Sequence, residues 1–429
     1  MNEFVKIKDL KRDFFQEGLL YSNPCRGLWN IVHLATQVPG SHQIYVCPTS
    51  CLRGVVLTTA EMGVLDRLST ITVGEDNILD GDLEERILYG TRKILNTLNR
   101  KPTVVFIFTS CIHHFMAANY QRVYKILRQE YPTISFIDAY MDPIMRKKTP
   151  PLPCLQRQIY RVLQPTNSKK NQCNFIDNWF YPENNDLYDY LIEHGVQVND
   201  LSQQNTYSSY LEMNQSAVNF SFHRFGKLAC NDMFYRLKQN YLFLPNVFDY
   251  EQIDKSIDQA CEYMHIPKKS MHQKEHERKS TENTINHLRE LLKDTMISID
   301  QSAIEYPLSL ALFLEKHDIK VHSLFLDALL EDEDTLNQLI AYNPNIKIYS
   351  IESCAMRQMH RESSNIVAIG QQAAFFLNTP YFVDIIFQAG MYGYKGISYL
   401  CTLIEEAYSD SKDIQMTVSH KGWRCIARE

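Results

Sequence analysis

The sequence lacks the glycine motifs of nucleotide-binding proteins. It contains neither a G-x-G-x-x-G at a helix start nor a G-x-x-x-x-G-K-[ST] phosphate loop, so it gives no sign of its own nucleotide site. The G-x-S-x-G motif of hydrolases and the H-E-x-x-H motif of zinc proteases are also missing. The chemistry of this chain must therefore be sought in other residues.

Long apolar runs and excess positive charge are absent as well. The most apolar stretch, Val104–Phe108, has only the length of a strand, and the N-terminus has no signal-peptide core, which predicts a cytoplasmic protein. The net charge of −6 argues against broad nucleic-acid binding. We therefore expect neither a membrane nor a nucleic acid as a partner.

What the chain does contain is cysteine. The 11 cysteines among 429 residues are odd in number and irregularly spaced, which does not fit a disulfide framework. The paired C-x2-C motifs usual in zinc sites are missing. Four cysteines are expected to be small buried hydrophobic residues: Cys173, Cys261, Cys401 and Cys425.

Alternating strand and helix patterns predict a mostly parallel α/β protein with three Rossmann-like domains. The expected domains are 1–165, 166–290 with a polar linker at its end, and 291–429. Within the first domain, 1–20 is expected to be helical and 70–82 loop-like. The amphipathic pattern at 83–98 predicts a helix, followed by a buried strand at 103–109. The charged segment 268–290 carries His272, His276 and His287, and its many charges favour a solvated helix or linker over a metal site.

Cys47 and Cys51 lie on a sharp turn after the short strand Ile44–Val46. Such a C-x3-C pair can bind a metal or an iron–sulfur cluster, carry out redox chemistry or be buried. Cys25 also lies on a turn, and Cys111 follows the predicted strand at 103–109, at the end where parallel sheets bind ligands. Four turn thiols can converge on a cluster, because cluster ligands must be exposed thiolates.

These motifs resemble those of the nitrogenase component 1 superfamily. Cys25 before a glycine-containing helix, the turn Val46–Cys51 and the strand-Ser-Cys111-helix arrangement are similar to the family's three cluster-binding motifs. The second family motif is usually His-Gly-Pro-x-Gly-Cys, so Cys51 takes the ligand position and Cys47 replaces a glycine. The C-terminal Thr379–Tyr381 and Gly393–Gly396 also match.

The resemblance implies three Rossmann-like domains and pairing with a homologous component 1 subunit, as a homo- or hetero-oligomer, a dimer or a tetramer. It implies an interface iron–sulfur cluster of the 4Fe-4S or P-cluster type, held by Cys25, Cys51 and Cys111, with Cys47 as an additional candidate. The function that follows is a reductase subunit, supplied with electrons by an ATP-dependent iron protein and acting on an unknown substrate. The alternatives are a scaffold for metallocluster assembly and a non-catalytic structural subunit.

A second metallocluster is implied only for the family's catalytic subunits. Cys230 stands near the position of the cysteine that holds one end of that cofactor, although a plain helix residue is the preferred interpretation. The histidine that holds the other end has no counterpart in Tyr381–Gln388. We therefore expect the first cluster, and retain Cys230 only as a candidate ligand.

Overall fold

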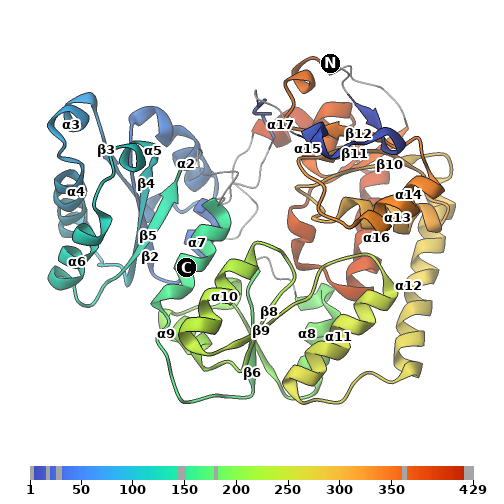
Figure 1. Cartoon of the computed structure of the whole chain (residues 1–429), viewed down its shortest axis with the longest axis horizontal. Coiled ribbons are helices and arrows are strands. Elements are labelled where there is room, and N and C mark those ends of the chain that lie inside the picture. Colours follow the sequence, from blue (N-terminus) through green and yellow to red (C-terminus); the bar gives the residue numbers. More distant parts are fainter. Residues whose placement is uncertain are drawn as a thin grey trace. The chain divides into compact units, whose positions relative to one another are not determined.

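The computed structural model of the protein describes residues 4–15, 20–25, 31–142, 151–177, 182–359 and 365–419 (Figure 1). They form an α/β protein with three sheets, which confirms the predicted fold class. In the described part of these sheets, only β1 (Val5–Lys6) runs antiparallel to its neighbour.

The chain divides into two compact units. Unit 1 comprises Met1–Gly27, Trp179–Val196 and Leu244–Ser419, and unit 2 comprises Leu28–Asn178, Gln197–Phe243 and His420–Glu429. Segment 268–290, predicted to end a second domain, belongs to unit 1. The division into three domains stays a prediction.

The first sheet, in unit 2, has the order β3-β2-β4-β5 with all strands parallel. Its strands are β2 (Ser41–Cys47), β3 (Leu68–Thr72), β4 (Val104–Ser110) and β5 (Ser135–Met141). The helices of this region are α1 (Ile31–Gln37), α2 (Thr49–Glu61), α3 (Glu75–Asp80), α4 (Leu83–Thr97), α5 (Cys111–Phe115), α6 (Tyr120–Glu130) and α7 (Pro151–Ile159).

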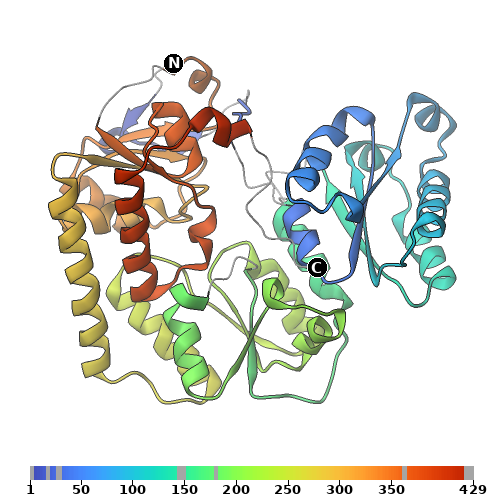
Figure 2. The same cartoon turned by 180° about the vertical axis from the view of Figure 1, so that it is seen from behind.

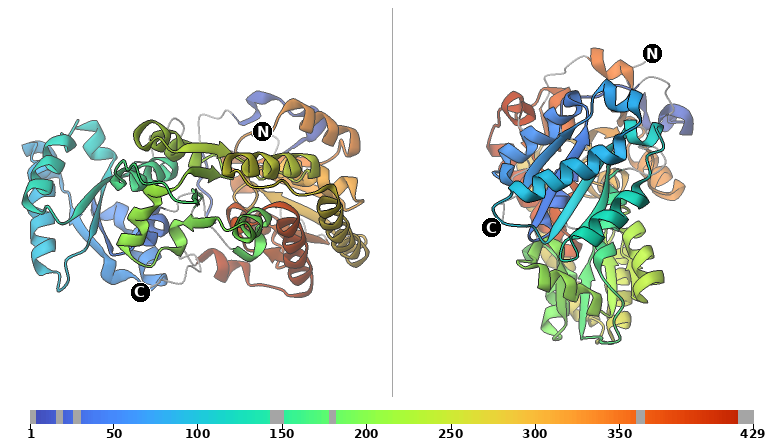
Figure 3. Two further views of the ribbon diagram at one scale, coloured as in Figure 1. Left: turned by 90° about the horizontal axis from the view of Figure 1, so that it is seen from below. Right: turned by 90° about the vertical axis from the view of Figure 1, so that its left-hand side faces the viewer.

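Alternating strand residues build the core of this sheet. Ile44 and Val46 of β2, with Val105 and Ile107 of β4, belong to one apolar cluster with side chains of α4 and α6, because every second residue of a strand points to the same face. Figure 3 shows α4 and α6 over the sheet. The predicted apolar face of the helix at 83–98 is confirmed, since its side chains are buried in or packed against this cluster.

The second sheet, also in unit 2, has the order β7-β6-β8-β9 and is entirely parallel. Its strands are β6 (Gln172–Phe175), β7 (Gln197–Asp200), β8 (Val218–Ser221) and β9 (Asn240–Phe243), with the helices α9 (Tyr207–Leu211) and α10 (Gly226–Leu237). Helix α10 packs against α7. The chain leaves unit 2 between β6 and β7 to form α8 (Asp186–Glu193) in unit 1.

The third sheet lies in unit 1 and has the order β1-β12-β11-β10-β13-β14. Its parallel strands are β10 (Met296–Asp300), β11 (Val321–Leu326), β12 (Lys347–Ser350), β13 (Ile366–Ile369) and β14 (Phe382–Val383). The helices are α11 (Tyr250–Met264), α12 (Met271–Leu292), α13 (Pro307–Lys316), α14 (Glu333–Tyr342), α15 (Gln371–Leu377), α16 (Gly393–Ser409) and α17 (Ile414–Ser419). Helices α12 and α16 lie side by side (Figure 2).

Two local expectations in the first 82 residues were wrong. The described part of 1–20 forms β1 and two short 3-10 turns rather than a helix, because β1 pairs with β12 through Val5 and Ile348. Segment 70–82 contains the end of β3 and all of α3. The polar residues of β3 are tolerated because this strand forms the edge of its sheet.

Asp186 links α8 to the first turn of α16 through two hydrogen bonds, which are called the Asp186 clasp below. Its carboxylate accepts a hydrogen bond from the Lys395 N–H at 3.1 Å, and its own N–H donates to the Tyr392 carbonyl at 3.3 Å. Gly393 has φ +76°, and a Cβ there would lie 2.4 Å from Asp186 Oδ2. Burial raises the pKa of Asp186 to about 6, although the positive charge of Lys269 opposes that rise. Gly393 is therefore required for both its backbone angle and its missing side chain.

Replacing Gly393 by alanine is expected to destabilise unit 1. The matched control is Gly195→Ala in the same unit, because Gly195 has φ +73° but open space around its Cβ position. The control should cost about 1–2 kcal/mol for the left-handed backbone, and Gly393→Ala a further about 1–3 kcal/mol because the carboxylate must move. Denaturant unfolding measures both, and equal losses would contradict the clasp.

The ionisation of Asp186 should make stability depend on pH. Its folded-state pKa of about 6 exceeds the unfolded value of about 3.9, so the folded state binds more protons between these values and stability falls as pH rises. Between pH 4 and pH 7 wild type should lose about 2 kcal/mol of stability relative to Asp186→Asn, which cannot ionise. The free energy of unfolding of both proteins is measured at several pH values. If it changes with pH by the same amount in wild type and in Asp186→Asn, the prediction is refuted.

Candidate functional site

The strand order of the first sheet creates a switch point between β2 and β4. The strand β2 comes first in the chain, but the later strands β3 and β4 lie on opposite sides of it. In open parallel sheets, ligands bind in the crevice at the carboxyl ends of the strands beside such a point. The turns that follow β2 and β4 are therefore the first place to look for a site.

Three of the predicted ligand cysteines lie on these two turns. Cys47 is the last residue of β2, Cys51 is the third residue of α2, and Cys111 is the first residue of α5, directly after β4. Register places Val46 of β2 opposite Thr109 of β4. The structure thus brings Cys47, Cys51 and Cys111 to the same edge of the first sheet.

The three thiols differ in exposure. Cys47 has no exposed surface, Cys51 is exposed, and Cys111 is intermediate. Burial, with smaller contributions from the negative charges that Cys51 and Cys111 can carry, raises the pKa of Cys47 to about 12. Cys47 is therefore held as a neutral thiol, whereas Cys51 is accessible.

The helix dipole favours negative charge on the exposed thiol. Cys51 lies in the first turn of α2, whose N-cap, Pro48, offers no side-chain hydrogen bond to the helix. A helix N-terminus stabilises thiolates and other anions because its backbone N–H groups lack partners within the helix. This end of α2 is suited to a thiolate ligand.

Cys25 belongs to the other unit. It is 8% exposed, within an apolar cluster that includes Met356 and Phe376, and its Sγ lies 3.7 Å from the carbonyl oxygen of Gln371 in α15. The predicted ligand set is thus divided between unit 1 and unit 2, and its assembly stays a prediction.

Cys230 is enclosed in α10. It has no exposed surface, and burial raises the pKa of its thiol well above the usual value, with the negative charge of Asp177 adding to the rise. Its environment suits a neutral core thiol, and its role as a cofactor ligand stays a prediction. Cys173, Cys261 and Cys401 are buried as expected, and Cys425 lies outside the described residues.

The switch points of the other two sheets are filled by the chain's own carboxylates. Asp177, which follows β6, accepts hydrogen bonds from the N–H groups of Phe222 and His223 at 2.6 and 3.2 Å, in the turn before α10. Asp300 ends β10 and accepts from Gln372 and Ala373 at 2.8 and 3.0 Å, in the first turn of α15. Backbone donors of this kind would otherwise be available to a phosphate.

Sequence reasoning missed these two aspartates. The available signal was an aspartate directly after a short apolar strand, Cys173–Ile176 or Met296–Ile299. At the third sheet, the missing side chain of Gly370 leaves the space that the Asp300 carboxylate occupies, because a Cβ there would lie within 2.5 Å of all three carboxyl atoms of Asp300. The absence of a nucleotide-binding glycine motif agrees with this arrangement.

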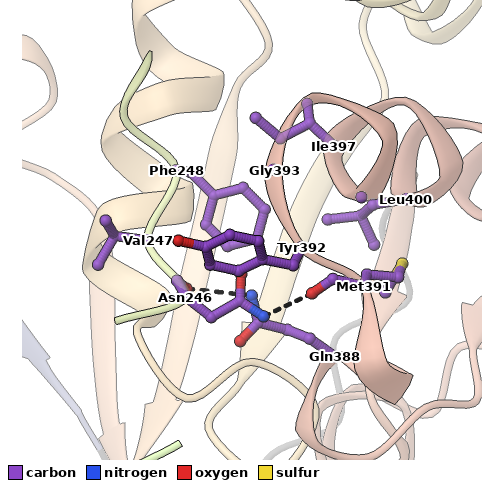
Figure 4. Close-up of a pocket in the computed structure, with 10 residues that line it drawn as sticks. Asn246, Val247, Phe248, Gln388, Met391, Tyr392, Gly393, Ile397 and Leu400 are labelled. Atoms are coloured by element: carbon purple, nitrogen blue, oxygen red, sulfur yellow. Dashed lines mark hydrogen bonds between the residues drawn. The ribbon is translucent and has the colours of Figure 1, made fainter. Parts of the chain in front are cut away.

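A small cavity in unit 1 is lined by polar and apolar side chains (Figure 4). It offers about 10 Å³ of space, which suits a single water molecule and is far too small for a substrate. Gln388 lines it and has φ +54°, after Phe387 at φ +47°.

Within the described ranges, no group of three or more His, Cys, Asp or Glu side chains is placed to hold a single metal ion, and no helix is long and apolar enough to cross a bilayer.

Comparisons with known proteins give a consistent result. A family model described as nitrogenase component 1 type oxidoreductase matches residues 34–402. A solved structure described as nitrogenase Cp1 at pH 6.5 shares 14% identity, with a TM-score of 0.69, over 94% of this chain and 95% of the other. A second, nitrogenase Cp1 at pH 5, shares 9% identity with a TM-score of 0.58, over 95% and 94%. None of the curated proteins compared with the chain matches it.

The exposure difference between Cys51 and Cys47 predicts different reactivity. In the cluster-free chain at pH 8, iodoacetamide should alkylate Cys51 at least about a hundredfold faster than Cys47, because only a thiolate reacts and Cys47 is both buried and neutral. Mass spectrometry of timed digests measures both rates. In urea the two rates should converge, and similar rates in the folded chain would contradict the geometry.

Proposed function

The chain belongs to the nitrogenase component 1 type oxidoreductases. From that premise we propose that it is a reductase subunit that receives electrons from an ATP-dependent iron protein. Electrons would enter through an iron–sulfur cluster at an interface with a homologous subunit and continue to a substrate not yet identified. The observation that carries the proposal is the convergence of Cys47, Cys51 and Cys111 at the switch point of the first sheet.

The thiols present fit an iron–sulfur cluster of the 4Fe-4S or P-cluster type. Cys51 and Cys111 would be ligands, each in the first turn of a helix that follows a parallel strand, and Cys25 would be the third ligand. When bound, such a cluster accepts and releases single electrons. The uncapped end of α2 would stabilise the negative charge of the thiolates.

Cys47 has a different role in this proposal. Because its thiol is fully buried beside the other two and stays protonated, it is suited to donate a weak hydrogen bond to a neighbouring thiolate rather than to act as a first ligand. Hydrogen bonds to cluster sulfurs alter the reduction potential. Direct ligation by Cys47 would require its deprotonation.

A partner subunit and an iron protein are both part of the proposal. In this proposal the cluster is completed by ligands from a second, homologous chain. The ATP site would belong to the iron protein, because this chain lacks a phosphate loop and the donors near α10 and α15 are occupied by Asp177 and Asp300. A cytoplasmic location and the three-domain division remain proposals.

A metallocluster assembly scaffold is the second candidate function. It is favoured by the missing histidine in Tyr381–Gln388 and by the complete burial of Cys230, which leave no exposed anchor for a second cofactor at those two positions. A non-catalytic structural subunit would share these features. Single-turnover electron transfer from a reduced iron protein in the presence of ATP separates these roles, because only a reductase should oxidise the iron protein in an ATP-dependent manner.

The cluster itself is tested by metal analysis. The chain, co-expressed with its homologous subunit and purified anaerobically, should contain iron and acid-labile sulfide in equal amounts and give an EPR signal after reduction. Cys51→Ala and Cys111→Ala should each lose most of the iron, because a ligand thiolate is removed.

Cys354→Ala is the matched control, since Cys354 is partly exposed and has no role in the proposal. It should retain the iron content and EPR signal of wild type. Full iron content in Cys51→Ala and Cys111→Ala, or a wild-type complex without iron, would refute the cluster.

A further inference from the structure

Helix α12 presents a pair of histidines on its solvent side. His272 and His276 are four residues apart near its N-terminus, so they are neighbours on one face of the helix. Glu275 lies between them in sequence, which gives the pattern H-x-x-E-H, the spacing used for metal binding in inverzincins. The three side chains are called the outer face below.

The opposite side of α12 fixes the helix on the third-sheet unit. Thr281, Ile285, Leu288 and Leu292 are buried, and α12 packs along α16. The Thr281 hydroxyl donates to the carbonyl of Tyr394 at 3.3 Å, and Ser270 caps the N-terminus by accepting from the Gln273 N–H. The outer face is therefore carried by an anchored helix, which reduces the entropy lost when a ligand is bound.

Most of the basic residues near the pair contact acidic or aromatic side chains. In sequence, Lys268–Lys279 appears rich in positive charge, which would repel a cation. In the structure three of its lysines are paired with carboxylates of α11 or α12: Lys268 with Glu262, Lys269 with Glu277 and Lys274 with Asp258. Arg278 lies over the Tyr250 ring, 5.0 Å from its centroid.

The outer face has no structural task in the part of the chain that the structure describes. His272, Glu275 and His276 are all exposed, and within the described ranges no side-chain hydrogen bond or ion pair involves any of the three. His287, farther along the same helix, differs in that its Nε2 lies 3.5 Å from Glu405 Oε1. The imidazoles of the pair are thus free to turn toward a shared ligand.

We propose that His272 and His276 bind one divalent transition-metal ion of the zinc, nickel or copper class. Imidazole nitrogens are good ligands for these metals, and two imidazoles on one helical face can chelate the same ion. Glu275 adds a negative charge beside them. Water completes the coordination, because no third protein ligand is placed at the pair within the described residues. This is an open binding site, distinct from the cysteine site and independent of the proposed reductase function.

Nickel titration tests the site in the full chain. Isothermal calorimetry under anaerobic conditions should show one Ni²⁺ equivalent that either His272→Gln or His276→Gln weakens at least about tenfold, because a chelate becomes a single ligand. Nickel should also raise the melting temperature of wild type more than that of either variant, since it binds the intact helix better than the unfolded chain.

His287→Gln is the matched control on the same helix, because it removes an exposed histidine that has no histidine partner four residues away. It should bind nickel as wild type does. If His272→Gln and His276→Gln retain the wild-type affinity and stoichiometry, or if His287→Gln weakens binding equally, the site is overturned. Iron content and EPR are expected to be the same in all three variants.

Discussion

Backbone N–H groups at the carboxyl edge of a parallel sheet need an acceptor, and this need organises the three sheets of the protein. Each strand beside a switch point passes into a turn and a helix whose first N–H groups have no partner within the helix. In the second and third sheets the chain supplies the acceptors itself, through Asp177 and Asp300. In the first sheet the same place holds three cysteines. The three edges are similar in topology but differ in the chemistry they can support.

That difference directs attention to the first sheet. An aspartate fixed by two backbone N–H groups closes its switch point to an external anion, because the donors are already used. At α2 the N-cap is Pro48, which cannot donate or accept through its side chain. Exposed Cys51 and half-buried Cys111 are therefore placed where thiolates are stabilised. The family to which the chain belongs gives this arrangement an oxidoreductase context.

The sequence predicted much of the fold but less of the site. Apolar strands and amphipathic helices such as β4 and α4 were found because their patterns reflect burial on one or two faces. The edge strand β3 and the short helix α3 were missed because they bury few apolar residues. The sequence placed Cys47, Cys51 and Cys111 on turns at the ends of strands, and the strand order seen in the structure brought these turns to one edge of the sheet. The occupation of the other switch points by aspartates could not, because it depends on hydrogen bonds between distant segments.

By itself the sequence determined the α/β class, the carboxyl-edge positions of the cysteines and the family, because these follow from periodicity and local motifs. Only the tertiary structure decided how individual side chains behave. Cys47 became a buried neutral thiol and Cys51 an exposed one, although both lie on one turn. The charged segment 268–279 became the start of the anchored helix α12, with Lys269 and Lys274 paired and His276 exposed. The reason is that burial and ion pairing depend on residues brought together from far apart in the chain.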